Sequence, residues 1–250
     1  MNTLEGKKAL VTGGTRGLGL AIVEALVARQ AQVTVIARDE ARLAEVSKRL
    51  GVAVIQGDVA DEALAQRALR EVQPSVLVLN AGAQPALGLI HEQTWEGFTG
   101  TWNSDVKAGF HWVQAALRLP LPRGSRVLIG SSGAAVNGSP LSGGYAGAKR
   151  MLWFLANYAN VSSKELGLGI HFQALVPQRM IGETELGRAG AEAYAKRKGV
   201  SVEALLAGFG APMPPAAVGA HVVSILTDPQ YEAGVAFGLK GDTGIVSLDG

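Results

Sequence analysis

The chain has 250 residues, of which 48% are hydrophobic and 18% are charged, so it can bury a sizeable core and is not intrinsically disordered. Its formal net charge is only +2, and no basic run is interleaved with aromatic residues, which argues against a nucleic-acid-binding protein. Cysteine is absent and the four histidines (91, 111, 171 and 221) are scattered, so we expect neither a disulfide framework nor a metal site.

Short apolar runs alternate with longer amphipathic segments along most of the chain. Runs rich in Val, Ile, Leu and Ala predict seven buried strands, over residues 8–13, 32–37, 52–58, 75–82, 125–132, 169–177 and 231–241. The segments between them predict helices over 17–30, 39–50, 61–72, 94–119 apart from its start, and 144–166, with a last helix after residue 215. Repeated strand–helix units predict one α/β domain spanning residues 1–250, with a Rossmann-like, doubly wound, seven-stranded parallel sheet.

Residues 178–215 interrupt this alternation. The segment is rich in Gly, Ala and charge, and it contains two short helix-like pieces, over 191–199 and 201–209. An insertion of this length is either a functional lid or a mobile appendage. Because it follows the sixth strand, near the strand ends, we expect a substrate lid at about 178–215.

The amino terminus leads almost directly into a strand-like run, which leaves no room for a signal peptide. No apolar stretch approaches the roughly 20 residues that a membrane-spanning helix needs. We therefore expect a soluble, cytoplasmic protein.

The first predicted strand runs into the sequence "TGGTRGLG", with Gly13, Gly17 and Gly19 at the start of a helix. Glycines in a strand–turn–helix let the backbone approach a pyrophosphate, and the helix amino terminus supplies N–H groups and a positive dipole end. The alternative is an ordinary tight turn. The position at the very start of a doubly wound sheet favours a dinucleotide-binding turn.

Charge near the end of the second strand indicates which dinucleotide binds. An NAD site usually places a carboxylate there to hold the ribose 2′-hydroxyl, but here Ala37 stands at that position and Arg38 follows. Arg16 lies inside the glycine turn. Because a guanidinium matches a 2′-phosphate with paired hydrogen bonds, the two arginines predict NADP(H). Asp39 complicates this interpretation, although it also suits the first turn of the next helix.

The stretch "GGYAGAKR" places Tyr145 four residues before Lys149, on one face of a predicted helix. A free phenol titrates near pH ~10, and a nearby positive charge lowers that pKa by roughly 1–3 units. The pair could therefore be a tuned acid/base. The alternative is a surface helix that carries Tyr and Lys at this spacing by chance.

Taken together, these motifs resemble the short-chain dehydrogenase/reductase family over essentially the whole chain. "TGGTRGLG" is similar to its cofactor turn, "GDV" at 57–59 to the segment with the adenine-side acid, and "NAG" at 80–82 to the motif that ends the fourth strand. "YAGAK" is similar to its catalytic segment, with Ser132 thirteen residues before Tyr145.

The resemblance implies a role for each catalytic residue. Tyr145 would exchange the substrate hydroxyl proton while the nicotinamide carries the hydride. Lys149 would hold the nicotinamide ribose and stabilise the phenolate through its charge. Ser132 would bind the substrate oxygen; its neighbour Ser131 is the competing candidate, and spacing favours Ser132.

The resemblance also implies the residues that hold the cofactor. They are Gly13, Thr15, Arg16, Gly17, Leu18, Gly19, Arg38, Asp58, Val59, Asn80, Ala81, Gly82, Tyr145, Lys149 and Pro177.

Two positions depart from the family pattern. Asp105 stands where the family carries a catalytic asparagine, and the nearby Asn103 is two residues out of register. We expect Asp105 to lie some ~6 Å from the phenol and to disfavour phenolate, which gives a working enzyme that needs more alkaline conditions to oxidise alcohols. Gln178 follows Pro177 where the family usually has glycine, which alters the floor of the pocket.

The predicted function is NADP(H)-dependent interconversion of a carbonyl and an alcohol on a small organic substrate. Two alternatives stay open: a cofactor-binding regulator or scaffold that has lost turnover, and an isomerase or lyase on the same fold. The resemblance also implies a homodimer or homotetramer with the two long helices at the interface.

Overall fold

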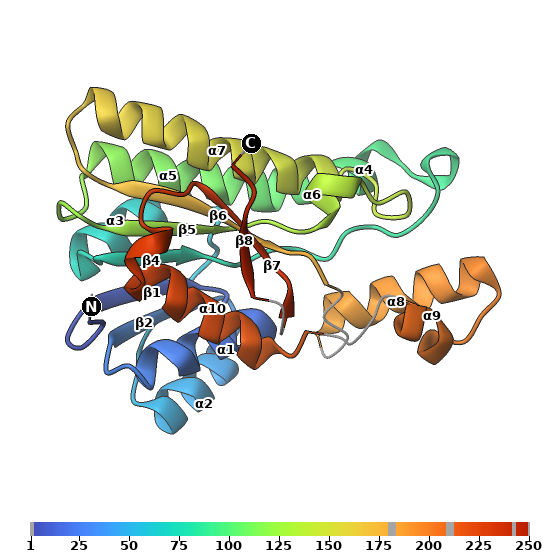
Figure 1. Ribbon diagram of the computed structural model, residues 1–250, viewed down its shortest axis with the longest axis horizontal. Coiled ribbons are helices and arrows are strands. Elements are labelled where there is room, and N and C mark those ends of the chain that lie inside the picture. The colour runs from blue at the N-terminus through green and yellow to red at the C-terminus, as the bar shows by residue number, and fades with distance from the viewer. Residues whose placement is uncertain (1–2, 180–183, 209–212, 242–243, 250) are drawn as a thin grey trace.

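The computed structural model describes residues 3–179, 184–208, 213–241 and 244–249. At its centre, the described residues form a sheet in the strand order β3-β2-β1-β4-β5-β6-β7-β8 (Figure 1). The strands are β1 Lys8–Thr12, β2 Gln32–Ala37, β3 Ala53–Gln56, β4 Val76–Leu79, β5 Arg126–Gly130, β6 His171–Pro177, β7 Ala236–Leu239 and β8 Ile245–Ser247. Strands β1 to β7 pair in parallel, which confirms the predicted doubly wound architecture.

The sheet differs from the prediction at its last edge. The described residues contain eight strands instead of seven, because β8 pairs antiparallel with β7. β8 has three residues and is only partly buried, so it lacks the long apolar run that identified the other strands. The turn before it includes Gly244, whose φ of +91° suits glycine.

Helices cover both faces of the sheet. The helices of the described residues are α1 Gly17–Val27, α2 Glu40–Leu50, α3 Glu62–Val72, α4 Trp95–Thr101, α5 Lys107–Arg118, α6 Ala134–Asn137, α7 Tyr145–Glu165, α8 Glu185–Lys198, α9 Val202–Gly208 and α10 Pro215–Thr227, with short turns η1 Ile90–Glu92, η2 Trp102–Val106 and η3 Pro229–Tyr231. α1, α2 and α10 pack on one face, and α3, α5 and α7 pack on the other (Figure 1).

Strand β1 shows why its sequence reads as a continuous apolar run. Leu10 contacts the layer that contains α3, α5 and α7, whereas Ala9 and Val11 contact the layer that contains α1, α2 and α10. Successive side chains of a strand point to opposite faces, so a strand covered on both sides is apolar throughout. All three residues are fully buried.

The predicted helix over 94–119 is present but is not uniform. It begins as α4, continues through η2, which is a π-helix, and ends as α5. A π-helical turn accommodates one extra residue in a helix and occurs frequently at functional sites. The predicted helix over 144–166 is α7.

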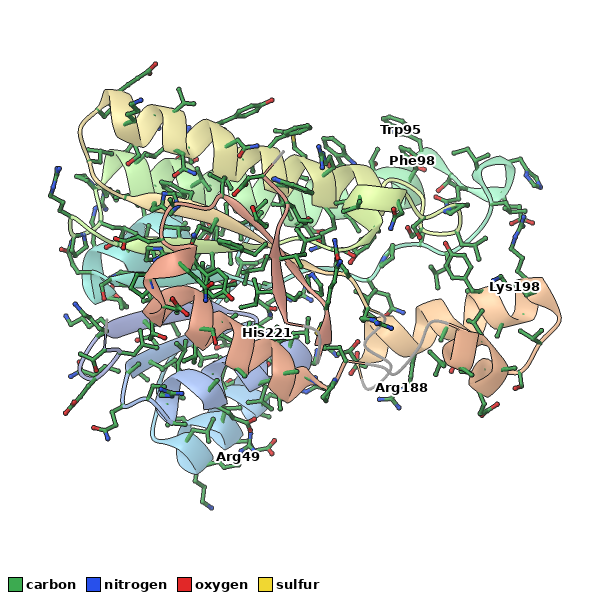
Figure 2. The ribbon with its side chains drawn as sticks, viewed as in Figure 1. Arg49, Trp95, Phe98, Arg188, Lys198 and His221 are labelled. Carbon is green, nitrogen blue, oxygen red and sulfur yellow. The ribbon has the colours of Figure 1, made fainter. Side chains whose placement is uncertain are left out.

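Helices α8 and α9 follow β6 and form an arm that projects from the body of the molecule (Figure 1). The two helices pack on each other through a small apolar cluster of Ala191, Ala195 and Leu205. Arg188 and Lys198 lie toward the two ends of α8 (Figure 2). The arm corresponds to the predicted lid, of which residues 180–183 and 209–212 lie outside the described residues.

Candidate functional site

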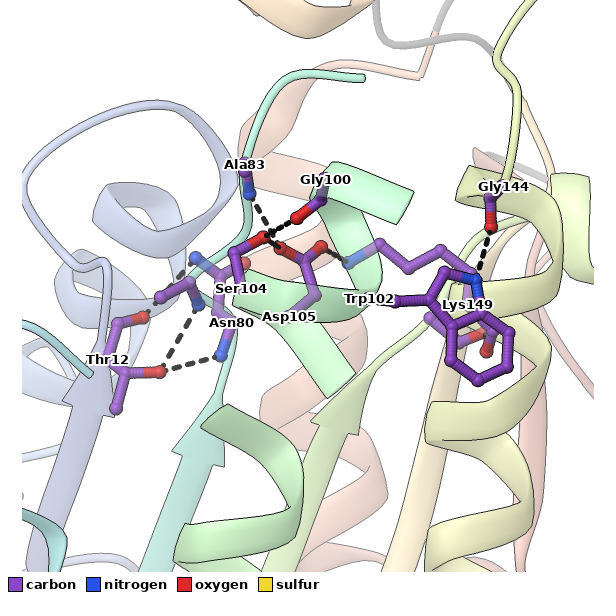
Figure 3. Close-up of polar contacts among 11 residues, drawn as sticks. Thr12, Asn80, Ala83, Gly100, Trp102, Ser104, Asp105, Gly144 and Lys149 are labelled. Carbon is purple, nitrogen blue, oxygen red and sulfur yellow. Dashed lines mark hydrogen bonds and ion pairs between the residues drawn. The ribbon is translucent and has the colours of Figure 1, made fainter. Parts of the chain in front are cut away.

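The predicted site residues meet at one edge of the sheet. Parallel strands end at the same edge, and the residues predicted for the site lie at or just after the carboxyl ends of β1 to β6, in η2 or in the first turns of α7. The strand order reverses between β1 and β4, where a doubly wound sheet usually binds its ligand. Figure 3 shows the polar contacts that connect this edge.

The turn after β1 requires its glycines. Gly13 and Gly17 have φ values of +68° and +54°, which an L-residue with a side chain rarely adopts. A Cβ on Gly19 would overlap the Gly13 carbonyl oxygen and lie 2.5 Å from the Asn80 amide nitrogen. The backbone of this turn is therefore closely packed and free of side chains at these points, as a phosphate cradle needs to be.

Thr12, the last residue of β1, ties the glycine turn to the end of β4. Its hydroxyl oxygen accepts hydrogen bonds from the backbone N–H groups of Asn80 (3.1 Å) and Ala81 (3.2 Å), as Figure 3 shows for Asn80. The Asn80 side chain donates in turn to the Gly13 carbonyl at 3.4 Å. Thr12 was not predicted as a site residue, although a hydroxyl at the end of an otherwise apolar strand is a signal that could have identified it.

The charges after β2 favour the arginine over the neighbouring acid. Asp39 caps α2 by accepting a hydrogen bond from Arg42 N at 3.0 Å, and its carboxylate also lies 3.3 Å from Arg42 Nε. Both carboxylate oxygens of Asp39 therefore contact Arg42 within α2, so this acid does not conflict with the predicted phosphate-binding role of Arg38. Arg38 is exposed at the end of the strand, on the same edge as the glycine turn.

Asp58 follows β3 and is exposed. One of its carboxylate oxygens accepts a hydrogen bond from Ala60 N at 2.9 Å, which orients the side chain at the sheet edge. The next residue, Val59, is partly buried against the core, and its carbonyl accepts the Trp112 indole N–H at 2.9 Å. Asp58 can therefore offer a carboxylate to a ligand, whereas Val59 can offer only its backbone and an apolar surface.

Arg16 has an unpredicted partner. Its guanidinium forms an ion pair with the carboxylate of Glu185, in the first turn of α8. The two residues are far apart in the sequence, so no local pattern indicated the contact.

Tyr145 and Lys149 lie together in the first turns of α7. The Lys149 ammonium is 5.6 Å from the centroid of the Tyr145 ring, and both side chains are largely buried. The predicted pairing on one helical face is therefore present in the structure.

Asp105 forms a buried ion pair with Lys149. The Asp105 Oδ2 atom lies 3.0 Å from Lys149 Nζ (Figure 3), and the side chains are 1% and 8% exposed. Asp105 Oδ1 accepts hydrogen bonds from Ala83 N at 2.8 Å and from Ser104 Oγ at 2.9 Å. A Cβ on Gly82 would lie 2.9 Å from Asp105 Oδ2, so this glycine makes room for the pair. The sequence indicated a carboxylate near the phenol but not its contact with the lysine.

The ion pair changes the protonation of the lysine. Burial alone would lower the pKa of Lys149, but the charge of Asp105, with a smaller contribution from Tyr145, holds the pKa of Lys149 above its ordinary value. Lys149 is therefore a fixed positive charge at neutral pH, and a carboxylate partly offsets its field.

The π-helix η2 contacts α7 at a second point. The Trp102 indole N–H donates to the Gly144 carbonyl at 3.0 Å, immediately before Tyr145 (Figure 3). One turn of irregular helix thus holds both ends of the segment from Gly144 to Lys149. Trp102 was not predicted, because an aromatic residue in a helix reads as an ordinary packing residue.

The two serines after β5 have different environments. Ser131 is buried and its hydroxyl donates to the Lys149 carbonyl at 2.7 Å, so it fastens β5 to α7. Ser132 is only partly buried, and its oxygen accepts a hydrogen bond from Ala134 N at 3.2 Å. The hydroxyl proton of Ser132 can still be donated to a substrate, which agrees with the spacing argument.

Gln178 fits the sheet without the backbone freedom of glycine. It is absent from the described non-glycine residues with positive φ. A Cβ on Gly238 of β7 would lie 2.9 Å from the Gln178 side-chain carbon Cδ, so the larger residue occupies space that Gly238 leaves open. The Pro177 carbonyl accepts a hydrogen bond from Gly133 N at 2.8 Å, which joins the ends of β6 and β5.

Two cavities among the described residues lie away from this edge. A cavity of about 160 Å³ lies between α3 and α5, and one of about 500 Å³ lies at the amino ends of β1, β2 and β3. None of the predicted site residues lines either of them. The candidate site is therefore defined by the chemistry of its residues and by its position in the sheet.

Comparison with known proteins supports the same assignment. The short chain dehydrogenase family profile matches residues 7–194. A 2,5-dichloro-2,5-cyclohexadiene-1,4-diol dehydrogenase of Sphingobium indicum is 33% identical over 187 residues, which are 71% of this chain and 74% of that protein. An L-fucose dehydrogenase of Rattus norvegicus is 30% identical over 250 residues, covering 94% of this chain and 88% of the relative. The crystal structure of a short chain dehydrogenase from Burkholderia cenocepacia in complex with NADP superposes with a TM-score of 0.75 at 29% identity, covering 97% and 99% of the two chains.

Proposed function

This chain belongs to the short-chain dehydrogenase family of oxidoreductases, which act on alcohol and carbonyl substrates. On that premise we propose that it uses NADP(H) and exchanges the substrate proton through Tyr145. The observation that carries the proposal is the convergence of Ser132, Tyr145 and Lys149 on the strand-end edge that also carries the glycine turn.

The residues of this edge fit a dinucleotide phosphate. The glycine turn would hold the pyrophosphate, because its close backbone packing leaves no side chains at Gly13, Gly17 and Gly19. The exposed Arg38 would hold the 2′-phosphate and Asp58 would face the adenine. The Burkholderia cenocepacia structure, which contains NADP, supports this choice of cofactor.

In the proposed mechanism the protein positions the substrate oxygen and moves one proton. Ser132 donates a hydrogen bond to that oxygen, and Tyr145 gives it a proton during reduction or takes one during oxidation. Lys149 stabilises the phenolate form of Tyr145 and would hold the nicotinamide ribose. The chemistry that the nicotinamide supplies, when bound, is hydride transfer to or from the substrate carbon.

The proposal is tested by comparing the wild type with Tyr145→Phe. NADPH oxidation is measured with a panel of ketones and aldehydes, and NADPH binding is measured separately. Tyr145→Phe should lower turnover at least about 10²-fold with nearly unchanged NADPH affinity, because the hydroxyl serves only proton transfer. Retention of more than about a tenth of the rate would show that another group carries the proton.

Cofactor choice has its own test. The wild type should bind NADPH more tightly than NADH, and Arg38→Ala should remove most of that difference. A charge-assisted contact contributes on the order of 1.5–3 kcal/mol. Equal affinity of the wild type for both cofactors would contradict the proposal.

A second candidate function is a cofactor-binding regulator without turnover. The buried Asp105–Lys149 ion pair favours this candidate, because the Asp105 carboxylate partly neutralises the Lys149 ammonium that the reaction needs. Tight NADPH binding without turnover of any carbonyl in the panel would support this candidate. The intact set of Ser132, Tyr145 and Lys149 argues against it and against isomerase or lyase chemistry.

We also propose that the α8–α9 arm is the substrate lid.

We propose in addition that the chain forms a homodimer or homotetramer through its two long helices. The large apolar side chains exposed on α5 and α7, which would be covered in such an interface, are Phe110, Phe154, Tyr158 and Val161. Light scattering of the wild type and a Phe154→Glu, Tyr158→Glu variant tests the oligomer. Among the described residues, no helix combines the length and apolarity needed to cross a bilayer.

A further inference from the structure

The arm touches the cofactor turn directly. Glu185 of α8 is paired with Arg16, which lies inside the glycine turn and immediately precedes α1. Next to it, the Thr184 methyl group would lie 3.5 Å from a Cβ on Gly17, so the start of α8 also packs against the turn. Thr184 fixes that start by accepting a hydrogen bond from Gly187 N at 3.0 Å.

The Arg16–Glu185 pair uses a charge that the proposed cofactor also needs. Arg16 and Arg38 are the two guanidiniums assigned to the 2′-phosphate. Arg38 has no carboxylate partner among the ion pairs of the described residues, whereas Arg16 already has one. Both side chains of the Arg16 pair are 56% exposed, so they can separate without burying a charge.

We propose that Glu185 is a cofactor-specificity residue that acts through Arg16, so that the lid and the 2′-phosphate of NADP(H) compete for one guanidinium. This inference rests on the proposed use of NADP(H). The 2′-phosphate carries nearly two negative charges and can displace a single carboxylate. The ribose hydroxyl of NAD(H) is neutral and leaves the pair intact.

The competition has a consequence for the arm. NADP(H) binding frees the Glu185 end of α8 from the cofactor turn, while NAD(H) binding leaves it attached. A second attachment, the Ser139–Tyr194 hydrogen bond of 2.9 Å, lies near the middle of α8 and involves no charge. The attachment of the proposed lid to the body of the protein therefore depends on which cofactor is bound.

The test is a double-mutant cycle on cofactor binding. Dissociation constants for NADPH and NADH are measured at low ionic strength for the wild type, Glu185→Gln, Arg16→Gln and the double variant. Glu192→Gln is the matched control, because it removes an exposed carboxylate two turns further along α8. Thermal unfolding of each cofactor-free variant checks that the fold is retained.

Glu185→Gln should bind NADPH about 1.5- to 5-fold more tightly than the wild type, the range expected for release of an exposed ion pair. Its NADH affinity should not change, and Glu192→Gln should match the wild type for both cofactors. In the Arg16→Gln background the Glu185 substitution should have no effect. The gain should shrink at high salt, because screening weakens exposed pairs.

Three results would overturn the inference: no change in NADPH affinity, an equal change for both cofactors, or a gain that persists without Arg16. An equal change would show that Glu185 affects the pyrophosphate region shared by both cofactors. Failure of the proposed function is distinguishable, because a wild type that binds NADPH no better than NADH fails before any variant is made.

Discussion

Replacing Asp105 with asparagine tests how the buried ion pair sets the chemistry of the site. The asparagine side chain has one oxygen, which would keep the hydrogen bond from Ala83 N. Its amide nitrogen would then face Lys149 Nζ, which is now 3.0 Å from Asp105 Oδ2. The substitution therefore leaves the volume nearly unchanged and removes the negative charge beside the ammonium.

The expected size of the effect follows from the distances. Lys149 Nζ lies 5.6 Å from the Tyr145 ring centroid, which stabilises a phenolate there by about 3 kcal/mol at an effective dielectric near 20. Asp105 Oδ2 lies 3.0 Å from Nζ and hence at most about 8.6 Å from the centroid; with the phenolate charge placed at the centroid, the carboxylate opposes it by about 1.9 kcal/mol. The carboxylate thus cancels more than half of the lysine's effect, and its removal corresponds to a shift of about 1.4 pH units.

The assay is the pH dependence of alcohol oxidation, followed as NADP⁺ reduction from about pH 6 to about pH 10. Asp105→Asn should move the rise in oxidation rate downward by about 1–2 pH units and should keep or increase the rate near neutral pH. Ser104→Ala is the control, because it removes a hydrogen bond to Asp105 but keeps the charge, and its profile should match the wild type.

Two results would refute this reasoning. An unmoved profile would show that the carboxylate does not act on the base electrostatically. Loss of activity with NADPH binding and thermal stability intact would show that Asp105 itself carries protons or that Lys149 needs its carboxylate partner to stay charged.

Three further predictions concern the support of the site and of the fold. Gly19→Ala should weaken NADPH binding at least about tenfold and lower stability by about 1–3 kcal/mol, because its Cβ would overlap the Gly13 carbonyl. Trp102→Phe should lower kcat about 2- to 10-fold with unchanged NADPH affinity, because it removes the hydrogen bond to the Gly144 carbonyl. His171→Gln should reduce the loss of Tm on acidification, because burial, only partly opposed by a backbone hydrogen bond, lowers the pKa of His171.

The sign of the last prediction follows from proton linkage. The pKa of His171 is below its ordinary value in the folded state, so the unfolded chain binds a proton more readily. This contribution to stability is complete above about pH 6.5 and is lost as the pH falls toward the lowered folded-state pKa.

The other two predictions have matched controls of the same chemical change. Gly190→Ala places a Cβ on α8 where nothing lies within 4 Å, so it should not weaken NADPH binding. Trp95→Phe alters an indole in α4 that is 72% exposed, and it should leave kcat unchanged. Equal effects of a variant and its control would contradict the contact that the prediction uses.

The sequence was sufficient for most of the architecture because the central strands are buried on both faces. Leu10, Val35 and Leu77 are fully buried, so their runs contain almost no polar residue and separate clearly from the helices. The same reasoning located the strand-end edge, because parallel strands place their following residues together. The short edge strand β8 escaped it, since half-exposed strands of three residues carry little pattern.

The contacts within the site could not be predicted from local pattern. The pairs Arg16–Glu185 and Asp105–Lys149 join residues on different elements, and only the packing of those elements decides which charges meet. Spacing placed Tyr145 beside Lys149 because one helix fixes that distance. No helix fixes the distance from Lys149 to Asp105.

The extra residue in the π-helix η2 changes the direction in which the side chains before it point, relative to those of α5. Each residue of an α-helix turns the side-chain direction by about 100°. Deleting one residue from Trp102–Val106 would restore regular α-helical hydrogen bonding, but it would also turn Asp105 relative to α5 and away from Lys149. Regular helix geometry and the buried ion pair are therefore mutually exclusive in this segment. Substitutions within the segment can retune the site, whereas a change in its length would dismantle it.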